Sequence, residues 1–508
     1  MFIRFWRGGY SLALSFWVIA PLVAALAFAL PEGVGYLVRG QDFNPALILA
    51  AIVAIWAIVV FAQLYLTVGV WRSAVHHRRD RMIGKRGLWG VAAQAVLIVA
   101  ALNLLRVFVL TGVPELTEGT RMAFLDDPAL PPYSMRLMRD GTEAEIAGGF
   151  KYGLARDAET LFASAPRLRV VHLNSAGGRL GEAIKLARLI RARGLVTYTS
   201  VACVSACTIA YTAARDRHLK AGTRLGFHRS VFAGNENAGE MRRPLLAAGI
   251  EPSFVERAVA QPASSIWYPT DAELTSGRVV SAIVDSYRYA ASGFGGQAPL
   301  AVFKNALRQS PLALLETSDP QLFDEMAELY WRRYFEDRSA GEIEDELRVT
   351  KISPFIAKRL PQADDDIQVD YARLYADQYA ALEARDPAAC FTFATKGGDA
   401  RLMSLLGAEL QQRELALTDR VLRSTGARPP PQPAIVQLAN TAVLEVLSAQ
   451  FDAPTVNLFA DPAKVQLRQY DLFCRVAIAR FRAIAALPER QAGELMSSLF
   501  STAKSAKR

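Results

Sequence analysis

The stretch TSVACVSAC, residues 199–207, places Ser205 between two cysteines at the end of an apolar run. Further along the chain, RLGFHRS carries His228 in another short apolar segment. A serine hydroxyl becomes a nucleophile when a neighbouring base takes its proton, and histidine is the most frequent base. A serine between a strand and a helix is otherwise most often a helix cap. The chemistry to consider is nucleophilic attack by Ser205 with His228 as general base.

Alternating strands and helices would position these residues. The segment 134–147 has the pattern of two short strands around an Asp-Gly turn, and 153–164 that of a helix. LRVVHLNS then predicts a buried strand, GEAIKLARLIRARG an amphipathic helix, and LVTYTSVA a second strand. We expect another helix from about Ser205 and a further strand at RLGFH. This alternation implies right-handed crossovers and a mainly parallel α/β sheet over residues 133–290.

A glycine pair lies in the loop after the first of these strands, in the sequence Asn174-Ser175-Ala176-Gly177-Gly178. Loops at the carboxyl ends of parallel strands meet at one edge of the sheet, so this loop should lie near Ser205 and His228. Glycines let backbone N–H groups point into a site. Backbone donors, a serine and a histidine are the components of an oxyanion hole and an activated nucleophile.

These residues resemble the Clp protease proteolytic subunit (ClpP) and its membrane-bound relatives, within the superfamily that contains the crotonases. NSAGGRLGEAIKLARLIR resembles that family's strand, Ser-Pro-Gly-Gly turn and helix, and VACVSACTIAYTAARDRHLKAGTRLGFHRS is similar to its nucleophile helix and base-bearing strand. The resemblance implies a ClpP/crotonase-like α/β fold and serine endopeptidase activity. By position, it makes Ser205 the nucleophile, His228 the general base, and the N–H groups of Gly178 and Ala206 the oxyanion donors.

The third member of a triad departs from that family's pattern. Ser265 stands where the family has an aspartate, and Asp271 follows six residues later, where it is as readily an acid in the first turn of a helix. A Ser-His dyad and a triad completed by Asp271 or another acid both stay open. Lys220 is the alternative base in this region, and His228 is the better candidate.

Three uncharged or nearly uncharged apolar runs precede this domain, at about 11–30, 46–71 and 88–108. Each is long enough to cross a bilayer as a helix. The first lacks a small-residue cleavage site followed by a polar mature start, so it is interpreted as an anchor. We therefore expect a membrane anchor over residues 1–111 with three transmembrane helices.

The basic residues between the second and third runs predict the orientation of the anchor. This loop holds Arg72, Arg78, Arg79, Arg81, Lys85 and Arg86, and basic loops stay cytoplasmic. An odd number of crossings then puts everything after about residue 111 on the periplasmic side. The expectation is a multi-pass protein of a bacterial inner membrane.

The chain holds four cysteines, Cys203, Cys207, Cys390 and Cys474, all in the part expected outside, where disulfides persist. The simplest pairing joins Cys203 to Cys207 and Cys390 to Cys474. Four buried free thiols are an equally good interpretation, because free cysteine packs as a small hydrophobic residue.

The remaining segments are a polar, proline-containing linker at 112–132 and an all-α region at 291–508, where apolar residues recur at spacings of three and four. No motif in 291–508 points to a function, and we expect no metal and no cofactor. Much of the net charge of +9 lies in the cytoplasmic loop, so nucleic-acid binding is not indicated.

The sequence therefore predicts a membrane-anchored serine peptidase acting on peptides or membrane proteins beside the bilayer, and the family resemblance implies a homo-oligomer. A non-catalytic scaffold or binding protein of the cell envelope is the alternative, favoured by the missing acid. Acyl-CoA chemistry of the crotonase kind is weaker, since the domain is expected to face away from cytoplasmic CoA.

Overall fold

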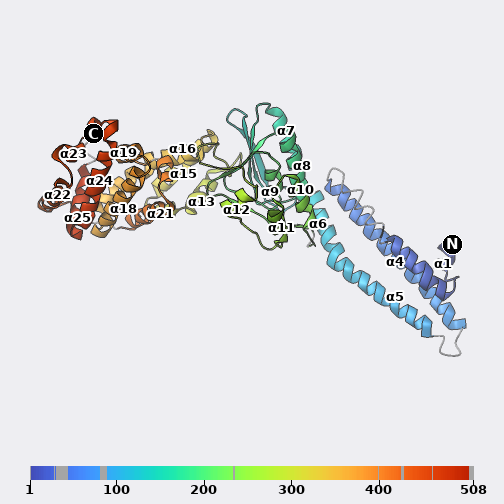
Figure 1. Cartoon of the computed structure of the whole chain (residues 1–508). Coiled ribbons are helices and arrows are strands. Elements are labelled where there is room, and N and C mark those ends of the chain that lie inside the picture. The colour runs from blue at the N-terminus through green and yellow to red at the C-terminus, as the bar shows by residue number, and fades with distance from the viewer. Residues whose placement is uncertain are drawn as a thin grey trace. The chain divides into compact units, whose positions relative to one another are not determined.

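The computed structural model describes residues 2–27, 29, 44–80, 88–232, 235–398, 400–424, 428–459 and 461–502. The chain divides into two compact units, Met1–Val284 and Asp285–Arg508, and Figure 1 colours both along the chain. The division falls close to residue 290, where the α/β domain was expected to end. The basic residues Arg81, Lys85 and Arg86, on which the orientation prediction partly rests, lie outside the described residues.

The first unit begins with the helices α1 Phe2–Trp6, α2 Leu12–Leu14, α4 Pro45–Asp80, α5 Leu88–Val107 and α6 Val113–Phe124, of which α1, α4, α5 and α6 are labelled in Figure 1. Two helices are long and apolar enough to cross a membrane, Pro45–Arg79 and Leu88–Phe124, with mean hydropathies of 2.7 and 2.3. The first apolar run forms a shorter helix, Leu12–Ala27. Two of the three expected spans are thus present by length and composition, and the third is not shown.

Residues 113–124, which we expected to form part of a linker, are helix α6 instead. A helix is possible there because Pro114 falls in the first turn, where proline removes no needed hydrogen bond. One side of α6 is buried at Gly119 and Met122. The helix continues α5 through Phe108–Gly112.

A mixed α/β domain follows, as expected. Its strands are β1 Tyr133–Met138, β2 Glu143–Gly148, β3 Val170–Asn174, β4 Val196–Thr199, β5 Ala202–Val204, β6 Arg217–Lys220, β7 Arg224–Gly226, β8 Ser230–Phe232, β9 Asn235–Asn237 and β10 Ala282–Val284. Its helices are α7 Leu154–Ser164, α8 Leu180–Ala192, α9 Cys207–Thr212, α10 Gly239–Ala247, α11 Pro252–Ala260 and α12 Asp271–Ser276. The main sheet has the order β1-β2-β3-β4-β6-β10. All its pairs are parallel except β1 with β2, which form the hairpin expected around the Asp-Gly turn.

The segment LVTYTSVA, expected to be one strand, is divided between two sheets. Its first half is β4 of the main sheet, and its second half is β5, which pairs in parallel with β7. The division has a local cause, because Asn174 Oδ1 accepts the backbone N–H groups of Ser200 at 3.1 Å and Val201 at 2.9 Å. Those N–H groups are therefore not available to continue the β4 ladder.

The second unit is helical, as expected. Its helices are α13 Leu300–Arg308, α14 Leu315–Ser318, α15 Pro320–Phe335, α16 Ala340–Leu347, α17 Ser353–Arg359, α18 Asp365–Glu383, α19 Pro387–Lys396, α20 Ala400–Leu405, α21 Ala408–Arg423, α22 Pro433–Ser448, α23 Ala453–Leu458, α24 Tyr470–Ala486 and α25 Glu489–Thr502. Helix α18 is the centre of the larger core, where α19, α21, α24 and α25 pack against it. A disulfide joins Cys390 on α19 to Cys474 on α24, and both cysteines are fully buried.

Replacing the Cys390–Cys474 pair by alanines should destabilise the second unit. The bridge closes a long stretch of chain, with a sequence separation of 84, and a loop of that length predicts a loss of about 4 kcal/mol in the free energy of unfolding. Hydrogen exchange of α18 and α24 in the oxidised wild type and the double variant measures this, with α7 of the first unit as an internal control. Equal exchange in the two proteins would contradict the prediction.

Candidate functional site

Ser205 occupies a sharp turn between β5 and α9. Its backbone is left-handed, with φ of 57°, which is unusual for a residue with a side chain. Its N–H donates to Gly226 O at 2.9 Å, and its carbonyl accepts from Thr208 N–H at 3.0 Å and Thr208 Oγ1 at 2.7 Å. Helix α9 therefore begins at Cys207, two residues after Ser205, close to where we expected a helix to begin. A strained turn from strand to helix is a geometry that can present a nucleophile.

The two cysteines beside Ser205 form a disulfide. Cys203 and Cys207 are joined with an S–S distance of 2.02 Å, and both are fully buried. Of the two sequence interpretations, paired cysteines and buried free thiols, the structure has the pairs. The bridge links the end of β5 to the start of α9 and so restrains the turn between them.

The glycine loop lies against this turn. Ser175 N–H donates to Ala202 O and Val204 N–H donates to Ser175 O, both at 2.9 Å, which ties the loop to β5. Gly177 has φ of 100°, and a Cβ atom there would lie 2.7 Å from Ser205 Cβ and 2.7 Å from Val204 O. Only glycine fits at this position without a shift of the backbone.

Two backbone N–H groups of the site are unoccupied. Among the hydrogen bonds of the residues that the structure describes, neither Gly178 N–H nor Ala206 N–H has an acceptor. Ala206 N lies 3.1 Å from the point where a Gly177 Cβ would be, so the second donor borders the glycine loop. N–H groups in such a setting normally bind something, and a developing oxyanion would satisfy them.

His228 lies two residues after the end of β7, and Ser205 lies directly after the end of β5. The two strands pair in parallel with Val204 beside Gly226, so both residues leave the same end of this small sheet. His228 Nδ1 lies 2.8 Å from the carbonyl oxygen of Arg229. A carbonyl only accepts, so in the neutral ring Nδ1 carries the proton and Nε2 has the lone pair that a general base needs.

A backbone carbonyl therefore takes the contact that an aspartate makes in a triad. Arg229 is held in turn by α11 and its end, because its N–H donates to Gln261 O at 3.0 Å and its Nη2 to Ala260 O at 2.7 Å. Sequence reasoning missed this partner, since a carbonyl has no residue signature. The contacts of the described chain do not include a hydrogen bond between Ser205 and His228, and such bonds are often long before a substrate binds.

Among the hydrogen bonds and ion pairs of the described residues, none joins Asp271 to His228. Asp271 is the first residue of α12. It directly follows the N-cap residue Thr270, which forms a capping box with Glu273, and its side chain is exposed. No hydrogen bond of its carboxylate occurs among the described contacts. Ser265, at the position of the missing acid, is likewise exposed, and its N–H donates to Pro262 O at 3.0 Å. Lys220 ends β6, which pairs with β4 and β10 and not with β7.

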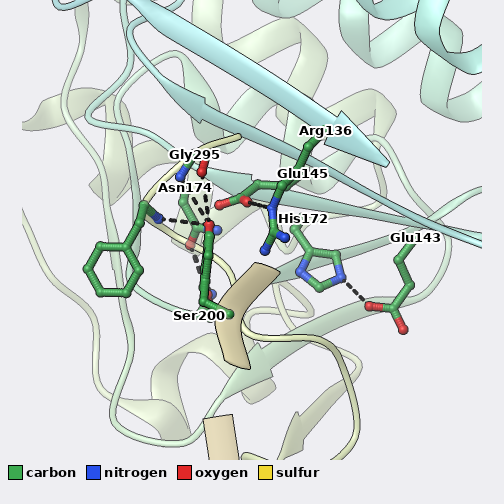
Figure 2. A network of polar contacts seen from close by, with 9 residues as sticks. Arg136, Glu143, Glu145, His172, Asn174, Ser200 and Gly295 are labelled. Carbon is green, nitrogen blue, oxygen red and sulfur yellow. Dashed lines mark hydrogen bonds and ion pairs between the residues drawn. The ribbon is translucent and has the colours of Figure 1, made fainter. Parts of the chain in front are cut away.

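Figure 2 shows a network of polar contacts, most of whose labelled residues lie on β1, β2 and β3. His172 is fully buried with Nε2 2.9 Å from Glu143 Oε2, as expected for a satisfied core histidine. Arg136 Nε pairs with the buried Glu145 at 2.7 Å. Asn174, drawn beside Ser200, begins the glycine loop and fixes it to the residues that precede β5. Asn174 is the member of this network that belongs to the glycine loop.

The comparisons with known proteins find solved structures alone. No family model matches the sequence, and no curated protein matches it. A variant of ClpP1 from Listeria monocytogenes is 18% identical, with a TM-score of 0.24, over 29% of this chain and 92% of that one. A variant of the membrane-bound stomatin-specific protease 1510-N is 15% identical, with a TM-score of 0.23, over 28% and 77%. An enoyl-CoA hydratase from Mycobacterium avium subsp. paratuberculosis is 14% identical, with a TM-score of 0.24, over 40% and 87%.

Identities of 14–18% and TM-scores of 0.23–0.24 show neither a family nor an activity. The function of this chain is therefore inferred from its own residues.

Replacing Gly177 by alanine should disable the site while the domain stays folded. The new methyl group collides with Ser205 Cβ, and displacing a reacting group by a fraction of an ångström lowers rates by at least about tenfold. Gly222→Ala is the matched control, because Gly222 has φ of 80° but no atom within 4 Å of its Cβ position. The rate of labelling of Ser205 by a fluorophosphonate compares the two variants. Equal rates would show that the Gly177 contact does not position Ser205.

Proposed function

We propose that this protein is a membrane-anchored serine peptidase whose nucleophile is Ser205. The observation that carries the proposal is the coincidence of a left-handed serine, two unoccupied N–H groups and a histidine with a free Nε2 at one end of β5 and β7. Each feature alone has an ordinary structural explanation. Together they supply a nucleophile, an oxyanion hole and a base, which are the parts that acyl transfer needs.

In the proposed reaction Ser205 Oγ attacks the scissile carbonyl while His228 Nε2 takes its proton. The N–H groups of Gly178 and Ala206 hold the oxyanion, His228 returns the proton to the leaving amine, and water then releases the acyl group. The Arg229 carbonyl keeps His228 in the required tautomer through Nδ1. This arrangement is a dyad oriented by a backbone carbonyl, without Asp271.

The substrates we propose are peptides or membrane-associated proteins close to the bilayer. Two apolar helices suggest membrane association, and two disulfides suggest an oxidising compartment. A periplasmic active domain on a multi-pass inner-membrane anchor fits both features. A homo-oligomer that restricts access to the site is part of the same proposal.

The second candidate is a scaffold on the same fold. The exposed Asp271 and the lack of a described Ser205–His228 hydrogen bond favour it. It predicts a folded chain in which Ser205 does not react.

Labelling by a fluorophosphonate probe separates the two candidates. The full chain in lipid discs should be labelled, and Ser205→Ala should remove the label entirely. His228→Ala should slow labelling by about 10³-fold or more, because the general base is lost. Ser276→Ala, which changes an exposed serine on α12, is the matched control and should label like the wild type. A native, folded protein that takes no label would establish the scaffold instead.

Asp271→Asn tests the orientation of His228. If the Arg229 carbonyl fixes the tautomer, labelling and ester hydrolysis should stay within about threefold of the wild type. A triad completed by Asp271 would lose about 10⁴-fold in turnover, as when an orienting aspartate is removed. Steady-state hydrolysis of a p-nitrophenyl ester measures the difference, and a loss of that size would restore Asp271 to the site.

A further inference from the structure

Two consecutive aspartates follow helix α6 in an unusual conformation. Asp126 and Asp127 both have left-handed backbones, with φ of 50° and 45°. Such residues cost free energy and persist where the surroundings determine them. Asp127 N–H donates to Arg121 O at 3.0 Å, so the segment folds back on the end of α6. The contacts of the two aspartates show which parts of the domain they bind.

Each aspartate binds a cation on a different part of the α/β domain. Lys151 Nζ donates to Asp126 O at 2.7 Å and to its carboxylate at 3.0 Å. Arg179 donates to both oxygens of Asp127, from Nε at 2.6 Å and from Nη2 at 2.8 Å. The third donor of Arg179, Nη1, lies 2.5 Å from Glu118 on α6. A two-pronged contact of this kind fixes direction as well as distance.

Lys151 and Arg179 each directly follow a residue of a backbone bridge that holds the glycine loop. Phe150 and Gly178 form a parallel bridge, in which Phe150 N–H donates to Gly177 O at 2.9 Å and Arg179 N–H donates to Phe150 O at 2.7 Å. Lys151 follows Phe150, and Arg179 follows Gly178. A Cβ on Gly178 would lie 2.6 Å from Phe150 O, so the bridge is closely packed. The aspartates thus hold both sides of the loop that presents Gly178 N–H.

The charges of Asp127, Lys151 and Arg179 are largely removed from solvent, whereas the Asp126 carboxylate is 89% exposed. The side chains of Asp127, Lys151 and Arg179 are 3%, 8% and 14% exposed. Burial disfavours the charged guanidinium, but the hydrogen bonds to Asp127 and Glu118 outweigh it and raise the pKa of Arg179. A buried pair of this kind gives little net stability, whereas removing one partner leaves an unpaired buried charge. The main effect of the Asp127–Arg179 pair is therefore to fix the position of the glycine loop.

We propose that Arg179 is a positioning residue that fixes the Gly178 N–H for catalysis, and that it does so by clamping the glycine loop to Asp127 and to Glu118 of α6. The proposal rests on the proposed function of Ser205. It links the reaction to the helix Leu88–Phe124, one of the two that are apolar enough to cross a membrane, because α6 forms the end of that helix.

The test compares Arg179→Ala and Arg179→Lys in the full chain in lipid discs. Hydrolysis of a p-nitrophenyl ester should lose about 10- to 100-fold in kcat in Arg179→Ala with KM within twofold, since an oxyanion donor acts mainly on the transition state. Arg179→Lys keeps one charged contact to Asp127 and should recover most of the rate. Arg242→Ala is the matched control, because Arg242 pairs with Glu256 in the same domain at the exposed surface.

Hydrogen exchange of residues 174–182 gives a second readout that needs no activity. Exchange there should rise in Arg179→Ala, fall back in Arg179→Lys and stay unchanged in Arg242→Ala. Unchanged exchange and an unchanged kcat in Arg179→Ala would overturn the clamp. Equal losses in both Arg179 variants, with faster exchange throughout β2, β3 and β4, would overturn it too, because Arg179 would then only support the fold.

The same measurements separate this proposal from the peptidase itself. If the wild type hydrolyses no ester and takes no fluorophosphonate, the proposed function has failed. Localised exchange at 174–182 in Arg179→Ala would then still support the clamp as the device that holds the loop. If exchange at residues 174–182 does not rise in Arg179→Ala, that result alone would overturn the clamp.

Discussion

The close approach of Gly177 to Ser205 is the contact on which the rest of the site depends. It leaves no room for a side-chain atom, and it exists because three chain segments are tied together. Ser175 bonds the glycine loop to β5, and β5 pairs with β7, which leads to His228. The disulfide from Cys203 to Cys207 closes the turn. The backbone therefore determines where the Ser205 hydroxyl lies, before any side-chain partner acts.

The chemistry-bearing motifs were predictable because each is local. A glycine pair after a strand and a serine after the next strand can be recognised over a few residues, and parallel order places both at one edge of a sheet. The hairpin at the Asp-Gly turn, the helix near residue 180 and the helical second unit follow from periodicity in the same way. Cysteine pairing was open from the sequence, because proximity and not spacing decides it, and the structure has the pairs.

What could not be predicted depends on partners distant in sequence or on backbone groups that every residue has. LVTYTSVA has the composition of one strand, and it divides because Asn174 on another strand takes its N–H groups. The orienting partner of His228 is the carbonyl of Arg229, and every residue has a carbonyl. A search for an acid therefore pointed to Asp271, which lies exposed on α12. Helix α6 was missed because its polar residues and proline are typical of linkers as well as of exposed helices.

The distribution of strained backbone bears on the choice between enzyme and scaffold. Left-handed residues with side chains cost about 1–3 kcal/mol each and persist where the surroundings determine them. Arg139 lies in the hairpin turn after β1, where such a conformation is ordinary. Asp140 lies in the same turn, and Arg278 and Asp337 follow the ends of α12 and α15. Ser205 instead lies against Gly177, and Asp126 and Asp127 contact Lys151 and Arg179 beside the glycine loop. A scaffold would gain stability by relaxing these positions, whereas a catalyst needs the loop held in one geometry. The left-handed Ser205, in the turn that lies against Gly177, is thus a feature that the proposed enzyme needs and a scaffold does not.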